Sequence, residues 1–162
     1  MTAPDLPPSG GFEAIYRRNV NTVWNVCITF LRNPADAEDA VQETFLRLLR
    51  SGTEFDSAIH EKAWLIRTAQ NVCKDEHSRA RRRDVPLEAA PEPACDAPEL
   101  DETLRAMRTL PEKQRLALYL HYYEGYSAVE LSTLLCRPAA TIRSDLRRGR
   151  EALRELLGGD FR

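Results

Sequence analysis

The sequence has few aromatic residues, few glycines, no long apolar run and no paired cysteines. Aromatic residues make up 7% of the 162 residues, and glycine occurs 7 times. No stretch approaches the ~18 consecutive apolar residues of a transmembrane helix, so no membrane insertion is expected. The 4 cysteines are isolated in the sequence, which argues against zinc sites and disulfides and favours reduced thiols. The N-terminus lacks the features of a signal peptide, and we expect a cytoplasmic protein.

Regular alternation of apolar and polar residues is also missing, so no strands are predicted. The chain is 43% hydrophobic and 30% charged, a balance typical of soluble, helix-rich globular proteins. Apolar residues instead recur at spacings of three and four, the pattern of amphipathic helices. The predicted fold class is therefore all-α.

The net charge of −2 conceals an uneven distribution along the chain. Residues 1–83 carry +1, residues 84–102 carry −7 and residues 103–162 carry +4. The acidic stretch is also rich in proline, and its composition does not support a buried core. We therefore expect two small helical domains, an N-terminal bundle and a C-terminal helix-turn-helix, joined by a flexible acidic linker over 84–100. Residues 1–11 are expected to be disordered.

Helix-capping residues mark the ends of the predicted helices. Asn33 followed by Pro34 predicts the start of the second helix, which should end near Gly52. The third helix is predicted from about Glu61 into the arginine-rich run 79–83. That run exceeds what a helix C-terminus needs, so we favour phosphate contact over simple complementation of the helix dipole.

The second domain is predicted to contain four helices. The first runs from Leu100 to Leu110, and the next follows Pro111. Ser127 and Glu130 form a capping box ahead of a short third helix. After a break at 136–137, the last helix is predicted to carry its apolar residues on one side; they are Ile142, Leu146, Leu153 and Leu156. A short helix, a tight turn and a longer helix have the spacing of a helix-turn-helix.

The last predicted helix also carries a basic stripe. Its members follow helical offsets and are Arg143, Arg147, Arg150 and Arg154. Thr141, Arg143 and Ser144 occupy the first turns, where recognition helices contact bases in the major groove. A solvated charged face is the alternative, but the capped helix and turn ahead of it favour DNA binding.

Three carboxylates, Asp36, Asp39 and Glu43, lie on one side of the second helix. They suggest three alternatives: a Mg²⁺ site as in a nuclease, a solvated acidic face, or a docking surface for a basic partner. No partnering histidine or lysine accompanies them, so no metal site, cofactor or catalytic residue is predicted.

Five motifs in the same order resemble the extracytoplasmic-function (ECF) sigma factors, the promoter-specificity subunits of bacterial RNA polymerase. Residues 36–45, DAEDAVQETF, are similar to the family's D-A-E-D-x-x-Q-E-x-F block. Residues 63–79 match its W-L-x-x-x-A-x-N-x-x-x-D-x-x-R pattern. Leu110-Pro111, the segment 123–131 and the segment 141–146 complete the resemblance, which spans about 145 residues.

The resemblance implies sigma region 2 over 12–83 and sigma region 4 over 101–158. Region 2 would bind core polymerase and the minus-10 element and assist promoter melting, and region 4 would bind the minus-35 element. The implied core-polymerase contacts are Asp36, Asp39, Gln42, Glu43 and Phe45. The implied minus-10 contacts are Asn71, Lys74, Arg79 and Arg82. The implied minus-35 contacts are Arg137, Thr141, Arg143, Ser144, Arg147 and Arg148.

The implied partners are the clamp helices and flap of core RNA polymerase, promoter DNA and an anti-sigma factor. No enzymatic activity is implied. A stand-alone helix-turn-helix regulator is the alternative, although it leaves the acidic helix without a purpose. The chain departs from the family pattern in and after the turn, at Cys136 and Pro138, and in the last helix at Asp145 and Gly149. The departures at Asp145 and Gly149 bear on its preference for upstream DNA sequences.

Overall fold

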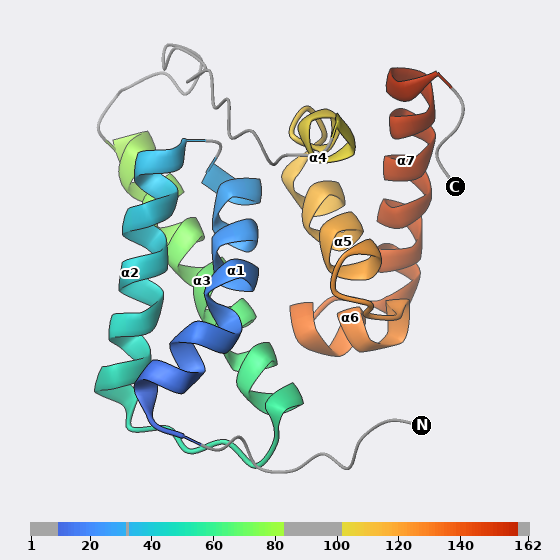
Figure 1. The fold of residues 1–162 in the computed structure, drawn as a ribbon. Coiled ribbons are helices and arrows are strands. Elements are labelled where there is room, and N and C mark those ends of the chain that lie inside the picture. The colour runs from blue at the N-terminus through green and yellow to red at the C-terminus, as the bar shows by residue number, and fades with distance from the viewer. Residues whose placement is uncertain (1–9, 32, 83–101, 159–162) are drawn as a thin grey trace. The chain divides into compact units, whose positions relative to one another are not determined.

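The computed structural model describes residues 10–31, 33–82 and 102–158, and within these ranges every regular element is an α-helix (Figure 1). The chain divides into two compact units at Pro93–Ala94, and each is described by itself. The segments expected to form the disordered N-terminus and the acidic linker lie largely or wholly outside the described residues. None of the described helices is long and apolar enough to cross a membrane.

The first unit contains three helices that pack against one another: α1 (Phe12–Leu31), α2 (Pro34–Ser51) and α3 (Ala58–Arg82). Its core is aliphatic, with Val23, Val26, Leu65 and Ile66 almost fully buried. Burial of such side chains contributes about 1.5–3 kcal/mol each. The amphipathic pattern therefore produced a three-helix bundle.

Capping residues fix the ends of α2 as the sequence predicts. The Asn33 side chain accepts a hydrogen bond from the Ala35 amide at 2.9 Å, and Pro34 is the first helical residue. The helix ends at Gly52, whose φ of 61° lies in the left-handed region that glycine adopts without strain. These caps set the length of the helix that carries the acidic residues.

Helix α3 begins at Ala58, three residues earlier than predicted. The reason is Ser57, whose hydroxyl accepts a hydrogen bond from the His60 amide at 3.0 Å and so caps the helix. Glu61 thus lies within the first turn, where it is 1% exposed. It accepts bonds from Arg18 at 3.0 Å and Asn19 at 2.6 Å, which join α1 to the start of α3.

The second unit contains α4 (Glu102–Met107), α5 (Glu112–Tyr122), α6 (Ala128–Leu135) and α7 (Ala139–Leu157). All three shorter helices contact α7. The core residues Leu118, Leu131 and Leu153 are fully buried. Leu100, the expected start of α4, lies outside the described residues.

One residue of the predicted apolar face of α7 is not buried. Leu156 is 54% exposed, whereas Leu146 and Leu153 are 4% and 0% exposed. At 3.6 residues per turn, Leu156 lies on the same side of the helix, about 40° from Ile142. It is, however, the second-to-last residue of α7, beyond Leu153, the last buried residue of the helix. Leu156 thus lies on the predicted side of α7 but beyond the part of that side that packs on the core.

The capping box of α6 is present as predicted. The Glu130 amide donates to the Ser127 hydroxyl at 3.2 Å, and the Ser127 amide donates to the Glu130 carboxylate at 2.7 Å. The backbone and side-chain hydrogen bonds with Ser127 lower the pKa of Glu130. Because the pKa of Glu130 is lower in the folded protein, the capping box stabilises the fold at pH values above the ordinary pKa of glutamate. This stabilisation is lost as the pH falls through the pKa of Glu130 in the folded state.

Candidate polymerase and DNA interfaces

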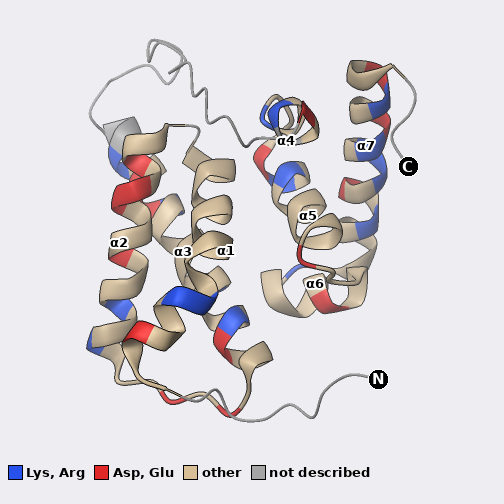
Figure 2. Ribbon diagram, viewed as in Figure 1, with Lys and Arg blue, Asp and Glu red and all other residues tan. Residues whose placement is uncertain are grey.

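The outer face of α2 presents part of the expected polymerase-binding set to solvent. Asp36, Asp39 and Gln42 are exposed, and their spacing of three residues places them along one side of the helix. Acidic residues lie in the first turns of α2 in Figure 2, where the helix dipole favours negative charge. Within the described residues, no cluster of histidine, cysteine and carboxylate side chains has the geometry of a metal site.

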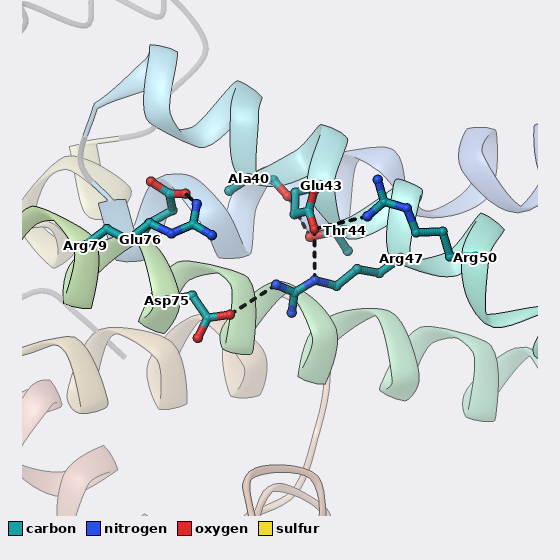
Figure 3. A network of polar contacts seen from close by, with 8 residues as sticks. All are labelled: Ala40, Glu43, Thr44, Arg47, Arg50, Asp75, Glu76 and Arg79. Carbon is teal, nitrogen blue, oxygen red and sulfur yellow. Dashed lines mark hydrogen bonds and ion pairs between the residues drawn. The ribbon is translucent and has the colours of Figure 1, made fainter.

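Glu43 belongs to a polar network that joins α2 to α3 (Figure 3). Its carboxylate lies 3.1 Å from Arg47 Nε and 3.7 Å from Arg50. Arg47 also bonds Asp75 at 3.1 Å, and this hydrogen bond is the main reason that its pKa is raised. Arg47 therefore stays charged and links Glu43 to the third helix.

Phe45 lies inside the bundle rather than on its surface. It is 3% exposed, and its ring contacts Phe12 edge-on at 6.2 Å and Tyr16 at 4.8 Å between centroids. The family motif groups it with exposed residues, but the helical period turns it toward α1. In this structure Phe45 supports the packing beneath the acidic face.

The candidate minus-10 residues lie on one long helix, α3. Asn71, Lys74 and Arg79 are exposed, and Arg79 pairs with Glu76 at 3.2 Å. The side chain of Arg82 lies outside the described residues. The described members thus form a polar surface toward the C-terminal end of the helix.

Aromatic packing orders the segment that precedes α3. Phe55 is 9% exposed, and its ring meets His60 at 5.4 Å and Trp64 at 5.8 Å between centroids, both edge-on. Trp64 is half-buried. Its contact with Phe55 gives Trp64 a packing role.

The turn between α6 and α7 has the compact form of a helix-turn-helix. Cys136 closes α6 in the left-handed conformation, with φ 53° and ψ 47°. The Arg137 amide donates to the Ser132 carbonyl at 3.1 Å. The chain then enters α7 at Pro138. The sequence predicts this turn. Glycine is the residue that adopts the left-handed conformation of Cys136 most easily.

Helix α7 has two faces of opposite character. Ile142, Leu146 and Leu153 are buried against the rest of the unit. Most of the predicted DNA contacts are exposed on the other side: Thr141, Arg143, Arg147 and Arg148, with Ser144 half-buried. Figure 2 shows basic residues spaced along this helix. The apolar face thus fixes the helix and leaves the basic face available to a ligand.

Arg137 differs from the other candidate minus-35 residues, because its guanidinium pairs with Asp145 on α7. The two side chains are only 19% and 13% exposed. The unusual acidic residue at position 145 was the sequence signal for this ion pair, but it lies eight residues away and was not connected to Arg137. The structure gives Arg137 an internal partner that the sequence analysis did not anticipate.

The basic face also includes a residue that sequence reasoning missed. His121, near the end of α5, lines the same depression as Arg143, Ser144 and Arg147. No motif singled it out, because its neighbours on α7 are more than twenty residues away in the sequence.

Comparison with known proteins agrees with this two-part geometry. Residues 15–83 match the model of Sigma-70 region 2, and residues 100–153 match that of Sigma-70 region 4. These two regions, in this order, define the class as a bacterial sigma-70-type transcription factor.

Individual relatives show which group of sigma factors the chain is most similar to among those compared. The chain is 30% identical over 155 residues to the ECF RNA polymerase sigma factor SigW of Bacillus subtilis, covering 83% of this chain and 82% of SigW. It is 33% identical over 155 residues to the RNA polymerase sigma factor CarQ of Myxococcus xanthus, covering 91% and 89%. Its fold is similar to that of the sigma factor RpoE in a complex with the anti-sigma factor NepR from Bartonella quintana. That match has a TM-score of 0.73 and 23% identity, and it covers 93% of this chain and 98% of RpoE.

The chain belongs to the ECF sigma factors. It is therefore a transcription initiation factor rather than an enzyme, and the stand-alone regulator is the weaker interpretation.

Proposed function

We propose that residues 12–83 act as region 2, which binds core RNA polymerase and the minus-10 element, and that residues 101–158 act as region 4, which binds the minus-35 element. The observation that carries this proposal is the exposed basic face of α7, with Arg143 and Arg147, on a helix whose opposite face is buried. A rigid helix with basic residues in its first turns suits the major groove. The linker proposed over 84–100 would join the two contacts.

The polymerase contact is assigned to the exposed residues of α2. Asp36, Asp39 and Gln42 are solvent-exposed and close to the half-exposed Glu43. Such an acidic surface complements a basic partner such as the clamp helices, and complementary charge mainly increases the rate and specificity of association. Phe45 contributes by holding the α2 face against α1.

The minus-10 contact is assigned to the exposed side of α3, with Asn71, Lys74 and Arg79 as the described members. Lysine and arginine bind the phosphates of a separated strand, and asparagine offers hydrogen bonds to an unstacked base. Unstacking one base costs a few kcal/mol, so these contacts must favour melted DNA over duplex.

We also propose that the protein acts in the cytoplasm and that an anti-sigma factor restrains it. The fold of RpoE, which is solved in a complex with the anti-sigma factor NepR, supports the second point by analogy. The exposed face of α2 is the surface for which such an inhibitor and core polymerase would compete.

Run-off transcription tests the proposal. The purified chain is mixed with core polymerase and a library of bacterial promoter fragments, and the transcripts are sequenced. We expect initiation at a defined subset of fragments that share two spaced elements, and none with core polymerase alone. Binding to duplex DNA without any initiation would instead favour a stand-alone regulator.

A further inference from the structure

The side of α3 assigned to the minus-10 element carries an acidic residue in its middle. Asn71, Asp75 and Arg79 follow one another at intervals of four residues, and all three are exposed. Residues four apart lie on the same side of a helix, about 6 Å apart along its axis. A DNA strand that contacts both Asn71 and Arg79 therefore passes over Asp75, whose carboxylate repels the phosphates.

Arg47 reaches this carboxylate from the neighbouring helix α2 (Figure 3). Its Nη2 lies 3.1 Å from Oδ2 of Asp75. Its Nε lies 3.1 Å from Oε1 of Glu43, one turn earlier on α2, which anchors the guanidinium from the other side. The hydrogen bond to Asp75 is the main cause of the raised pKa of Arg47, so the guanidinium stays charged beside the carboxylate.

The pair formed by Arg47 and Asp75 is too exposed to act mainly as a clamp between the helices. The two side chains are 35% and 57% exposed. Ion pairs in such positions contribute little to stability, because water screens them and both side chains lose conformational freedom. A bound phosphate interacts with the same charges, and an unmatched unit charge about 6 Å away changes its affinity about threefold even at the dielectric constant of water. The pair can therefore affect strand binding without being essential to the fold.

The second carboxylate in this part of α3 is neutralised in a different way. Glu76 pairs with Arg79 at 3.2 Å, within the same helix. Arg79 is itself an assigned strand contact, so a phosphate that binds Arg79 competes with Glu76 for it. Arg47 lies on α2 and is not among the assigned strand contacts, so it can stay on Asp75 while DNA is bound.

We propose that Arg47 is a positioning residue of the minus-10 contact, which neutralises Asp75 so that a melted strand can lie across Asn71 and Arg79. Arg47 acts through Asp75 and does not itself bind the strand. The inference rests on the assignment of α3 to the minus-10 element in the proposed function. It adds to that contact a residue of α2, the helix assigned to polymerase, where Glu43 holds the same guanidinium.

The experiment measures how tightly a short fluorescent single-stranded DNA of random sequence binds to the chain in its complex with core polymerase. Each variant is purified as this complex, so that a change in polymerase affinity does not enter the measurement, and core polymerase alone is the blank. Fluorescence anisotropy gives the affinity at several salt concentrations. Circular dichroism of each free chain checks that the variant is folded.

The variants remove one charge or both charges of the pair. Arg47→Met keeps the length of the side chain and should weaken strand binding about threefold, because Asp75 is then unmatched. Arg47→Gln keeps hydrogen-bond donors without the charge and should behave in the same way. Asp75→Asn should bind about threefold more tightly, and the double variant Arg47→Met, Asp75→Asn should return to the wild-type affinity. These differences should shrink as the salt is raised above about 0.1 M, where the Debye length is about 10 Å.

Arg50→Met is the matched control, because it removes an equal charge from α2 at a residue that pairs with Glu43. It should bind the strand as the wild type does, and a loss equal to that of Arg47→Met would overturn the inference. Weaker binding by both Arg47→Met and Asp75→Asn would also overturn it, since the pair would then serve only to hold α2 against α3. If the wild-type complex binds the strand no better than core polymerase alone, the assignment of α3 to the minus-10 element is itself contradicted.

Discussion

At the scale of single residues, Gly149 shows how packing overrides helix propensity. It lies in the middle of α7, where alanine would ordinarily be favoured by about 1 kcal/mol. A Cβ at this position would lie 2.6 Å from Cδ1 of Leu118, which is fully buried, so the side chain of Leu118 would have to shift within the core. The departure from the family pattern at Gly149 is therefore explained by the close approach of α5 and not by DNA recognition.

We expect Gly149→Ala to destabilise the second unit by about 1 kcal/mol, because overpacking costs ~1–3 kcal/mol and the gain in propensity offsets only part of it. Urea denaturation followed by circular dichroism measures the loss. Fluorescence of Trp24 and Trp64, both in the first unit, is a built-in control and should not change. In a Leu118→Ala background the same substitution should be neutral or stabilising. Equal destabilisation in both backgrounds would contradict the steric explanation.

Cys136 is the opposite case, because a residue with a side chain occupies a backbone conformation that glycine adopts more easily. Its φ of 53° is left-handed, which costs a non-glycine residue ~1–2 kcal/mol. We expect Cys136→Gly to raise the free energy of unfolding by about 0.5–1 kcal/mol, after the greater entropy of glycine in the unfolded chain is subtracted. Cys136→Ala keeps the Cβ and should show no gain in the same denaturation assay. A stabilised alanine variant would point to the thiol rather than to the backbone.

Phe45 and Arg137 mark the limit of prediction at this scale. The family motif places both among the interface residues. Phe45 is buried because α1 contributes Phe12 and Tyr16 to the same cluster. Arg137 has an internal partner because Asp145 lies two turns along the next helix. The helical period of the sequence already places Phe45 on the buried side of α2, whereas the partner of Arg137 depends on a contact between elements, which the local pattern does not contain.

At the scale of elements, the sequence predicts those helix ends that have local causes. Asn33, Gly52 and the Ser127 capping box act within a few residues, and the structure confirms each. The sequence predicts a start of α3 three residues later than the one observed, because its cap, Ser57, does not precede an obvious apolar stripe. The depression beside His121 was not predictable, because it forms only when α5 packs on α7.

The ion pair between Arg137 and Asp145 joins the turn of the helix-turn-helix to its second helix. Because both groups are largely shielded from water, removing either one leaves the other without its partner. We expect Arg137→Ala and Asp145→Ala each to destabilise the unit, and a double-mutant cycle to give a coupling of about 1–2 kcal/mol in urea denaturation. Arg147 and Glu151, an exposed pair on α7, are the control and should couple by less than ~0.5 kcal/mol. Additive effects at 137 and 145 would show that the pair does not stabilise the turn.

At the scale of the whole molecule, two units with separate cores imply that two binding activities can be lost separately. The first unit presents Asp39 and Gln42, and the second presents Arg143, all of them exposed and outside the cores. Phe45 is unsuitable for this test, because truncating a buried phenylalanine costs about 3–5 kcal/mol of stability.

We therefore expect the double variant Asp39→Ala, Gln42→Ala to bind core polymerase roughly tenfold more weakly, about 1.4 kcal/mol, while its affinity for duplex DNA is unchanged. Arg143→Ala should leave polymerase binding unchanged and weaken DNA binding. If Arg143 contacts a base, the loss of DNA-binding free energy should be about 1–3 kcal/mol and confined to one upstream position. Association with core enzyme and with labelled duplexes measures the two activities on the same samples. Glu13→Ala removes an exposed charge from α1 instead of α2 and is the matched control. Parallel loss of both activities in either variant would contradict the division of labour, because it would mean that one unit depends on the other for its contact.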